Sequence, residues 1–296
     1  MSDQPTGPQA MGGAPNHRFL PGEPGSILSV PVPIDEEILV VGRTPPPSTE
    51  ERAGDSERVG TVTEIMDTRL PPWQMLCRIR VTFPFQTVLA TGWFVGPHAV
   101  VTAGHALFYH PYGGAAESIT VIPGKNGGIE PFGAIYSRRF EVHPQWRSSS
   151  DPHYDLGCIF IDSPRGSELG CFSVWAPKTE ELRHFRINMA GYPMEEQAGP
   201  LLDQGLLFHH VNEVEYLAEH RIYYHLKSKF GQSGGPVWLY RDASDLPIVV
   251  GVHAEGADSD RPGPSGFFDS STRITEDKFD VIAQWSKWSP PSDPVG

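Results

Sequence analysis

The chain has 296 residues, and its 36 Asp and Glu outnumber 23 Lys and Arg to give a formal net charge of −13. That balance excludes a strongly basic surface, so nucleic acid is not an expected partner, because neutralising phosphates requires clustered positive charge. No apolar run approaches the roughly 18 residues that span a bilayer. The 31 glycines, 30 prolines and short apolar runs indicate many strands and turns rather than long helices.

Residues 1–60 differ from the rest of the chain. They are rich in Pro and Gly and contain one short apolar run at residues 37–42. We interpret them as a flexible leader or a propeptide-like extension, with simple disorder as the alternative. They lack the basic start and apolar centre of a secretory signal.

The cysteine content bears on the compartment. Cys77, Cys158 and Cys171 give no evident disulfide framework, although one pair stays open as an alternative. Few cysteines and no signal peptide favour a reducing, cytoplasmic setting. Secretion stays open if a leader is missing or atypical, so the localisation is left unknown.

From about residue 72 the chain consists of short β-like runs separated by turn signals, at intervals that suit barrels. One helix is expected at residues 275–285, where Phe279, Ile282 and Trp285 share a face and Thr275 is a suitable N-cap. The expected strands lie at residues 77–81, 87–95, 99–103, 156–161, 187–191, 221–226, 236–240 and 248–253.

Three segments carry chemistry, and they occur in the order His, Asp, Ser. They are Val101-Thr102-Ala103-Gly104-His105, Tyr154-Asp155-Leu156-Gly157 and Gly231-Gln232-Ser233-Gly234-Gly235-Pro236-Val237. A serine hydroxyl needs an imidazole to accept its proton during attack. A buried carboxylate fixes the tautomer of that imidazole. Taken together, the segments predict a catalytic triad of His105, Asp155 and Ser233.

The glycines around the predicted nucleophile suggest the second part of the machinery. They let the backbone turn sharply, so that backbone N–H groups point at the oxyanion that forms during attack. Gly231 and Ser233 are placed to supply these two N–H groups.

The three segments resemble the signature segments of trypsin-like serine peptidases, and further stretches between residues 58 and 286 resemble the bacterial glutamyl endopeptidases. The resemblance implies an all-β fold of two packed six-stranded antiparallel barrels, followed by a C-terminal helix. We expect the N-terminal barrel over residues 61–175, with His105 and Asp155, and the C-terminal barrel over residues 176–296, with Ser233. It also implies serine endopeptidase activity on polypeptide substrates. The stretches resembling the glutamyl enzymes lie at residues 91–97, 121–127, 143–147, 190–193, 251–253 and 272–275.

The same resemblance implies cleavage after acidic residues, Glu and perhaps Asp. In the glutamyl family a histidine and a hydroxyl residue bind the substrate carboxylate, and the matching positions are His253 and Ser228. Lys227 would add positive charge if it points inward. Two residues depart from this pattern. Phe230 stands where the family has a small residue, and Glu255 would face the pocket with His253 unless the strand bulges.

Several alternatives stay open. The chain could be a catalytically silent barrel protein that only binds, or a serine peptidase with a non-acidic preference. The family habit also suggests a zymogen activated by cleavage of the extension, with new starts near Val40 or Val59. His209 and His210 are adjacent on a strand and face opposite sides, so we expect no metal site and no cofactor. The oligomeric state is not readable from the sequence.

Overall fold

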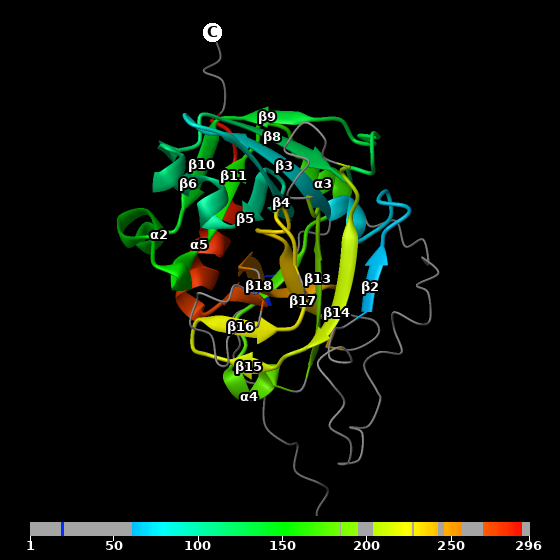
Figure 1. Ribbon diagram of the computed structural model, residues 1–296, viewed down its shortest axis with the longest axis vertical. Coiled ribbons are helices and arrows are strands. Elements are labelled where there is room, and N and C mark those ends of the chain that lie inside the picture. The colour runs from blue at the N-terminus through cyan, green and yellow to red at the C-terminus, as the bar shows by residue number, and fades with distance from the viewer. Residues whose placement is uncertain are drawn as a thin grey trace, which may run out of the picture.

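The computed structural model describes residues 19–20, 61–183, 185–194, 204–226, 228–241, 246–255 and 269–291. Within these residues the protein is mostly β-structure, arranged as two barrel-like sheets that pack against each other (Figure 1). The predicted pair of β-barrels with a C-terminal helix is confirmed. The residues of the extension other than Phe19 and Leu20 lie outside the described part, so its interpretation stays a prediction.

The first sheet has seven strands among the described residues, in the order β10-β11-β5-β4-β3-β8-β9, all paired antiparallel. It lies at the top of Figure 1. A small separate ribbon pairs β6 (Phe108–Tyr109) with β7 (Gly114–Ala115). The strands of the sheet are β3 (Leu76–Thr82), β4 (Thr87–Gly96), β5 (Ala99–Thr102), β8 (Ser118–Pro123), β9 (Ile135–Ser137), β10 (Arg139–Val142) and β11 (Gly157–Phe160).

The second sheet has ten strands among the described residues, more than the six expected, because short strands join its margins. Strand β1 pairs with β12, and β2 pairs with β14, so two segments from the N-terminal part of the chain contact this sheet. Its strands are β1 (Phe19–Leu20), β2 (Thr61–Glu64), β12 (Ser173–Trp175), β13 (Arg186–Gly191), β14 (Phe208–Glu213), β15 (Tyr216–Leu217), β16 (Arg221–Tyr224), β17 (Pro236–Leu239), β18 (Ile248–Glu255) and β19 (Asp269–Arg273).

Strand β3 shows why these segments form half-buried sheets. Cys77, Ile79 and Val81 alternate along it and are fully buried inside the first barrel. The same alternation turns Arg78 and Arg80 to the opposite face, where Arg80 is exposed. Arg78 is only 1% exposed, because part of the second barrel covers it.

The apolar core has three parts. One cluster fills each barrel, and a third lies between the barrels, where Trp93, Phe172 and Trp238 meet with ring centroids 5.7 Å apart in each neighbouring pair. Aromatic side chains bury the largest apolar areas. This shared core therefore packs the two barrels against each other, and it includes Val101 and Leu156 from the segments that carry His105 and Asp155.

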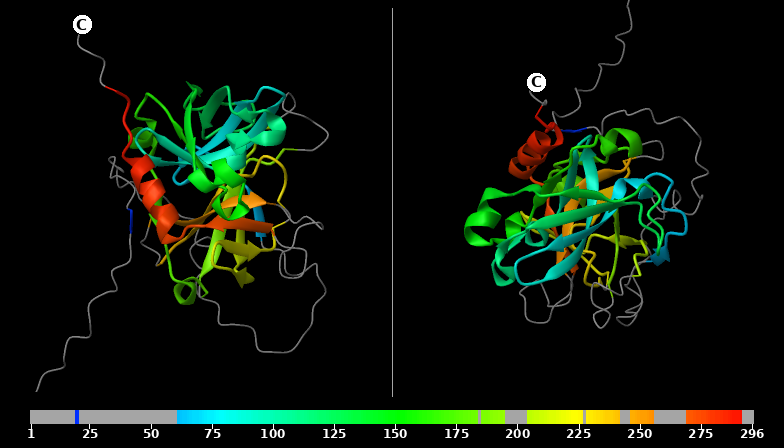
Figure 2. Two further views of the ribbon diagram at one scale, coloured as in Figure 1. Left: turned by 90° about the vertical axis from the view of Figure 1, so that its left-hand side faces the viewer. Right: turned by 90° about the horizontal axis from the view of Figure 1, so that it is seen from above.

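Helix α5 (Glu276–Ser286) begins directly after its N-cap Thr275, as the sequence predicts. Its buried Phe279, Ile282 and Trp285 join the core between the barrels, and Figure 2 shows the helix running along the side of both. The other helices are short: α2 (Pro144–Ser149), α3 (Arg165–Leu169) and α4 (Thr179–Leu182). No helix in the described residues is long and apolar enough to cross a membrane.

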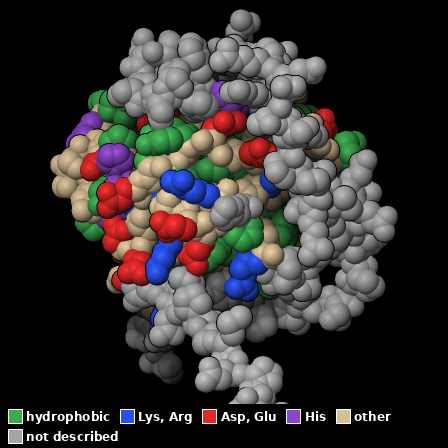
Figure 3. Space-filling model, turned by 90° about the horizontal axis from the view of Figure 1, so that it is seen from below, with side chains coloured by type: hydrophobic (Ala, Val, Ile, Leu, Met, Phe, Trp, Pro, Cys, Tyr) green, Lys and Arg blue, Asp and Glu red, His purple; other side chains and the backbone are tan. Residues whose placement is uncertain are grey.

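Charged side chains of both signs are interspersed on the described surface visible in Figure 3, so the acidic excess is not gathered into one patch on that face. All three cysteines are buried, and within the described structure none of them forms a disulfide with another. Burial raises the pKa of the Cys77 and Cys158 thiols well above its usual value, which keeps both in the unreactive thiol form.

Candidate active site

His105 lies in a single 3₁₀ turn, Gly104–Ala106, that follows strand β5. Both oxygens of Asp155 hold it. The backbone N–H of His105 donates to Oδ1 at 2.8 Å, and the ring Nδ1 lies 2.6 Å from Oδ2. Because a carboxylate only accepts, Nδ1 must carry a proton, so in the neutral imidazole Nε2 is unprotonated and able to accept one. The imidazole is 27% exposed, whereas the carboxylate is buried.

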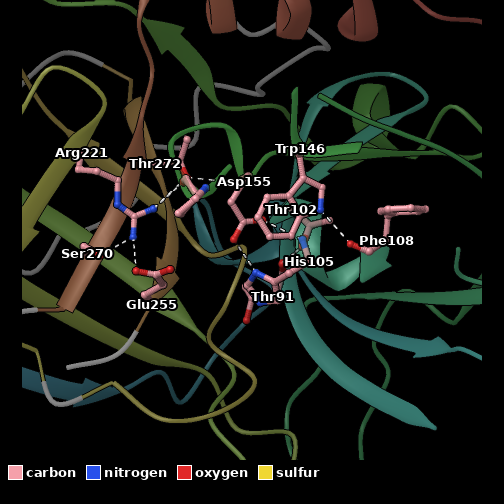
Figure 4. A network of polar contacts seen from close by, with 11 residues as sticks. Thr91, Thr102, His105, Phe108, Trp146, Asp155, Arg221, Glu255, Ser270 and Thr272 are labelled. Atoms are coloured by element: carbon pink, nitrogen blue, oxygen red, sulfur yellow. Dashed lines mark hydrogen bonds and ion pairs between the residues drawn. The ribbon is translucent and has the colours of Figure 1, made fainter. Parts of the chain in front are cut away.

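Asp155 is held from the second barrel as well. Its backbone carbonyl accepts a hydrogen bond from the Thr272 hydroxyl at 3.2 Å, so it lies between the two barrels (Figure 4). On the other side of His105, the Trp146 ring packs edge-on at 6.4 Å between centroids. The Trp146 Nε1–H donates to the Phe108 carbonyl at 2.8 Å, which fixes the indole. The imidazole is thus restricted on two sides.

The predicted nucleophile loop packs against the segment that carries His105. The Ser233 carbonyl accepts from Thr91 N at 2.8 Å, and the Thr91 carbonyl accepts from the Thr102 hydroxyl at 2.7 Å. A Cβ on Gly234 would lie 2.1 Å from Thr102 Oγ1 and 2.9 Å from Ala103 N. The structure therefore brings the Ser233 segment beside the residues that lead directly into His105.

The turn itself depends on glycine. Gly231 and Gly234 have φ values of +88° and +89°, in the region that residues with a Cβ rarely adopt. Gly234 N donates to the His253 carbonyl at 2.7 Å, which ties the loop to strand β18. Within the described part of the chain, no acceptor takes the N–H of Gly231 or Ser233. Two donors are thus available where the sequence analysis expects an oxyanion hole.

His253 and Ser228, the two expected specificity residues, are connected through a polar cluster on one face of the second sheet. His253 is buried, and its Nδ1 lies 2.8 Å from the Tyr224 hydroxyl. Ser228 donates its hydroxyl to Asp269 Oδ1, and the same carboxylate accepts from Leu226 N at 2.9 Å. Strand pairing places Tyr224 opposite Asp269, and His253 opposite Ser271.

The charge state of His253 follows from this burial. Loss of solvation lowers its pKa to about 4, although the negative charge of Asp269 opposes the shift. His253 is therefore a neutral imidazole at neutral pH. In the tautomer in which Tyr224 donates to Nδ1, the Nε2–H group is a neutral donor rather than a cation.

Glu255 does not follow the simple alternation that would turn it toward His253. A register shift between these two residues in the pairing of β18 with β19 marks an irregularity of the kind a β-bulge produces. Its carboxylate forms an ion pair with Arg221 at 2.6 Å, and Ser270 accepts a further bond from the same guanidinium nitrogen (Figure 4). Arg221 is 3% exposed, so this pair compensates two charges close to His253.

The remaining expectations concern single residues. Lys227 lies outside the described residues, so its role stays a prediction. Phe230 is 63% exposed and lies three residues before the predicted nucleophile, Ser233. His209 and His210 contact different partners, Asn188 Oδ1 and the Gln232 amide, each at 3.0 Å. Among the described residues, no group of three or more His, Cys, Asp or Glu side chains could hold a metal ion.

Sequence reasoning missed three contributors to this site: Arg78, Asp269 and the Arg221–Glu255 pair. In the sequence, Arg78 is one polar residue of an alternating run, and Asp269 is an acid that precedes a run of small residues. The one signal that could have identified these residues is their charge, because each is a charged residue within a segment that otherwise has the pattern of a β-strand. Their partners are far away in sequence, for example 114 residues from Arg78 to Tyr192.

The fold and the site together place the protein in a known class. A profile of the trypsin family matches residues 62–276, and the chain belongs to this family.

Individual relatives are consistent with that assignment. The chain is 30% identical over 223 residues to a glutamyl endopeptidase of Bacillus licheniformis, a match that covers 70% of this chain and 66% of the relative, just under two thirds of its length. It is 26% identical to a Bacillus subtilis protein named extracellular metalloprotease, over 76% of this chain and 67% of that one. A solved structure of a Glu endopeptidase in complex with MPD has a TM-score of 0.64 at 20% identity, covering 78% of this chain and 98% of its own, which supports the fold.

Proposed function

We propose that the chain is a serine endopeptidase in which His105, Asp155 and Ser233 form the catalytic triad. The observation that carries this proposal is the double attachment of His105 to Asp155, with the Ser233 loop packed beside it. Membership of the trypsin family and the similarity to a glutamyl endopeptidase support it.

In the proposed reaction the Ser233 hydroxyl oxygen attacks the scissile carbonyl carbon, and its proton passes to His105 Nε2. The Gly231 and Ser233 N–H groups bind the resulting oxyanion. The C–N bond then breaks as His105 returns the proton to the leaving amine, which leaves an acyl-enzyme on Ser233. Water repeats the sequence, with His105 again as base and then as acid, to release the carboxylic acid. Asp155 stabilises the imidazolium at each stage without being protonated.

We further propose that the preferred bond follows an acidic residue. The support is the relative named glutamyl endopeptidase and the contact between the Tyr224 hydroxyl and His253 Nδ1. In the proposed tautomer Tyr224 donates to Nδ1, and Nε2–H is a donor for a carboxylate. A neutral donor avoids the cost of burying a cation at this position.

One observation favours a second candidate, a serine endopeptidase with non-acidic preference. Ser228 already donates its hydroxyl to Asp269, so a substrate carboxylate would have to compete for that proton. Asp269 is itself buried and lies close enough to act on His253. A buried negative charge near the pocket disfavours a negatively charged substrate side chain.

Cleavage of a mixed peptide library decides between these proposals. The purified chain is incubated beside its Ser233→Ala variant, and fragment ends are read by mass spectrometry. Cuts after Glu or Asp that vanish in the variant support the triad and acidic preference together. Serine-dependent cuts after other residues keep the triad and favour the second candidate. Absence of labelling by a serine-directed phosphonate probe would instead favour the silent binding protein.

Activation by removal of the extension is part of the proposal. The pairing of Phe19–Leu20 with Val174 and Trp175 supports a contact between extension and body. Comparing the full chain with one that starts at Thr61 tests it, because equal activity of the two would contradict a zymogen.

A further inference from the structure

Arg78 is a buried cation for which strand alternation offers no structural reason. It lies on β3 of the first barrel, directly across from Thr91 on β4. Both side chains are essentially inaccessible, and both reach across the barrel interface to backbone groups of the second barrel. Burying a guanidinium costs free energy unless its N–H groups form hydrogen bonds, so the contacts of Arg78 indicate its role.

The contacts of Arg78 are with the nucleophile loop and the segment beside it. Its Nη1 donates to the Tyr192 carbonyl at 2.6 Å and lies 3.4 Å from the Gly231 carbonyl. The guanidinium carbon lies 5.9 Å from the centroid of the Tyr192 ring. Hydrogen bonds from a charged donor are roughly twice as strong as neutral ones. Gly231 is also closely packed here, since a Cβ on it would lie 2.7 Å from Arg78 Nη1.

Thr91 connects the same two segments. Its hydroxyl donates to the Gly231 carbonyl at 2.8 Å and accepts from Tyr192 N at 3.0 Å. The backbone N–H of Thr91 also holds the Ser233 carbonyl. One residue of the first barrel thus contacts both residues whose N–H groups form the proposed oxyanion hole.

These contacts determine the direction of the Gly231 N–H. The Phe230 carbonyl accepts from Met194 N at 2.6 Å, two residues after Tyr192. Because the peptide between Phe230 and Gly231 is planar and trans, its N–H points away from that bond. The carbonyl on the other side of Gly231 is held by Arg78 and Thr91. Both peptide planes that flank Gly231 are therefore restrained before substrate arrives.

We propose that Arg78, together with Thr91, is a positioning residue that keeps the oxyanion loop in its competent conformation. This inference rests on the proposed serine endopeptidase function. A preorganised donor costs no reorganisation when the oxyanion forms, so it contributes more to the transition state than to substrate binding. The two side chains hold the loop through permanent contacts from the neighbouring barrel, so substrate binding does not have to order it.

The test is Arg78→Met, which removes the cation and keeps a long apolar side chain. We expect kcat to fall by about 10- to 100-fold while KM changes by less than about threefold. The affinity for a peptide aldehyde, whose adduct with Ser233 carries the oxyanion, should fall by the same factor as kcat/KM. Substrate affinity, measured for Arg78→Met in a Ser233→Ala background, should not change. Arg78→Lys should restore part of the loss.

Controls separate positioning from stability. Arg80→Met removes an exposed arginine from the same strand and should leave both kinetics and aldehyde affinity unchanged. Thr91→Val should reproduce the Arg78→Met pattern and Thr91→Ser should not, which keeps the test available if Arg78→Met does not fold.

Three other outcomes have distinct meanings. Arg78→Met and Thr91→Val enzymes that melt earlier but keep wild-type kcat and aldehyde affinity would overturn the proposal. So would an equal loss of substrate and aldehyde affinity in both. A wild-type chain without Ser233-dependent hydrolysis would instead refute the proposed function, before any variant is compared.

Discussion

Replacing Asp155 by asparagine tests the electrostatic centre of the proposed mechanism, because the two carboxylate oxygens have separate partners. Oδ1 accepts the His105 backbone N–H and Oδ2 faces the protonated Nδ1. Asparagine offers one oxygen and one NH₂ group. If its oxygen keeps the backbone N–H, its NH₂ faces Nδ1, which must lose its proton to accept. Nε2 then carries the proton and can no longer take one from Ser233.

The opposite orientation of the amide places two donors, the NH₂ and the His105 backbone N–H, against each other in a buried site. That donor clash disfavours the second orientation, and the favoured first orientation removes the base. We therefore expect kcat for a peptide or ester substrate to fall by about 10⁴-fold, which is about 5 kcal/mol of transition-state stabilisation.

The assay is steady-state hydrolysis by the Asp155→Asn variant, with the melting temperature recorded alongside. The matched control is Asp162→Asn, which changes an exposed carboxylate and should leave kcat unaltered. Nitrogen NMR of the labelled imidazole should show the proton on Nδ1 in the parent and on Nε2 in the variant. An Asp155→Asn enzyme that keeps more than about one tenth of the parent kcat would refute the reasoning about the tautomer.

Three further outcomes are expected. Gly234→Ala should abolish phosphonate labelling of Ser233, because its Cβ would lie 2.1 Å from Thr91 O. The control Gly133→Ala also has a positive φ, +72°, but no atom lies near its Cβ, so it should cost only about 1–2 kcal/mol of folding stability. Burial lowers the pKa of His209 to about 3, so below about pH 6.5 the unfolded chain binds a proton that the folded chain does not, and the free energy of unfolding should fall as the pH drops. In His209→Gln, the decrease of the free energy of unfolding in urea between pH 7.5 and pH 5 should be smaller by about 2 kcal/mol. An unchanged slope would contradict this. Asp269→Asn should raise the rate on a Glu substrate relative to its Gln counterpart, measured as a ratio of kcat/KM; an unchanged or lower ratio would mean that Asp269 does not act on the pocket.

The fold and the proposed triad could be predicted from the sequence because both predictions depend on local signals. Apolar alternation around Ile79 and the short run that precedes His105 identify strands without knowledge of their partners. The glycines beside Ser233 likewise indicate a sharp turn, and the structure gives two of them positive φ. These signals lie within a few residues of the feature that they predict.

The surroundings of the site could not be predicted in the same way. Alternation shows that Arg78 leaves the interior of its own barrel, but not that the other barrel covers that face. Ser228 and Asp269 are 41 residues apart and meet only after β16 and β19 pair. The strand is irregular between His253 and Glu255, and Glu255 pairs with Arg221. No residue type in the strand predicts this irregularity.

The core between the barrels makes catalysis dependent on docking as well as on folding. His105 and Asp155 come with one barrel and Ser233 with the other, and the apolar contacts of Trp93, Phe172 and Trp238 keep the halves in register. A small slip along that seam would leave each barrel folded while separating the proposed base, His105, from the proposed nucleophile, Ser233. Activity should therefore be more sensitive to the alignment of the barrels than any spectroscopic measure of β-structure. It should be lost before the β-structure when the packing between the barrels is weakened.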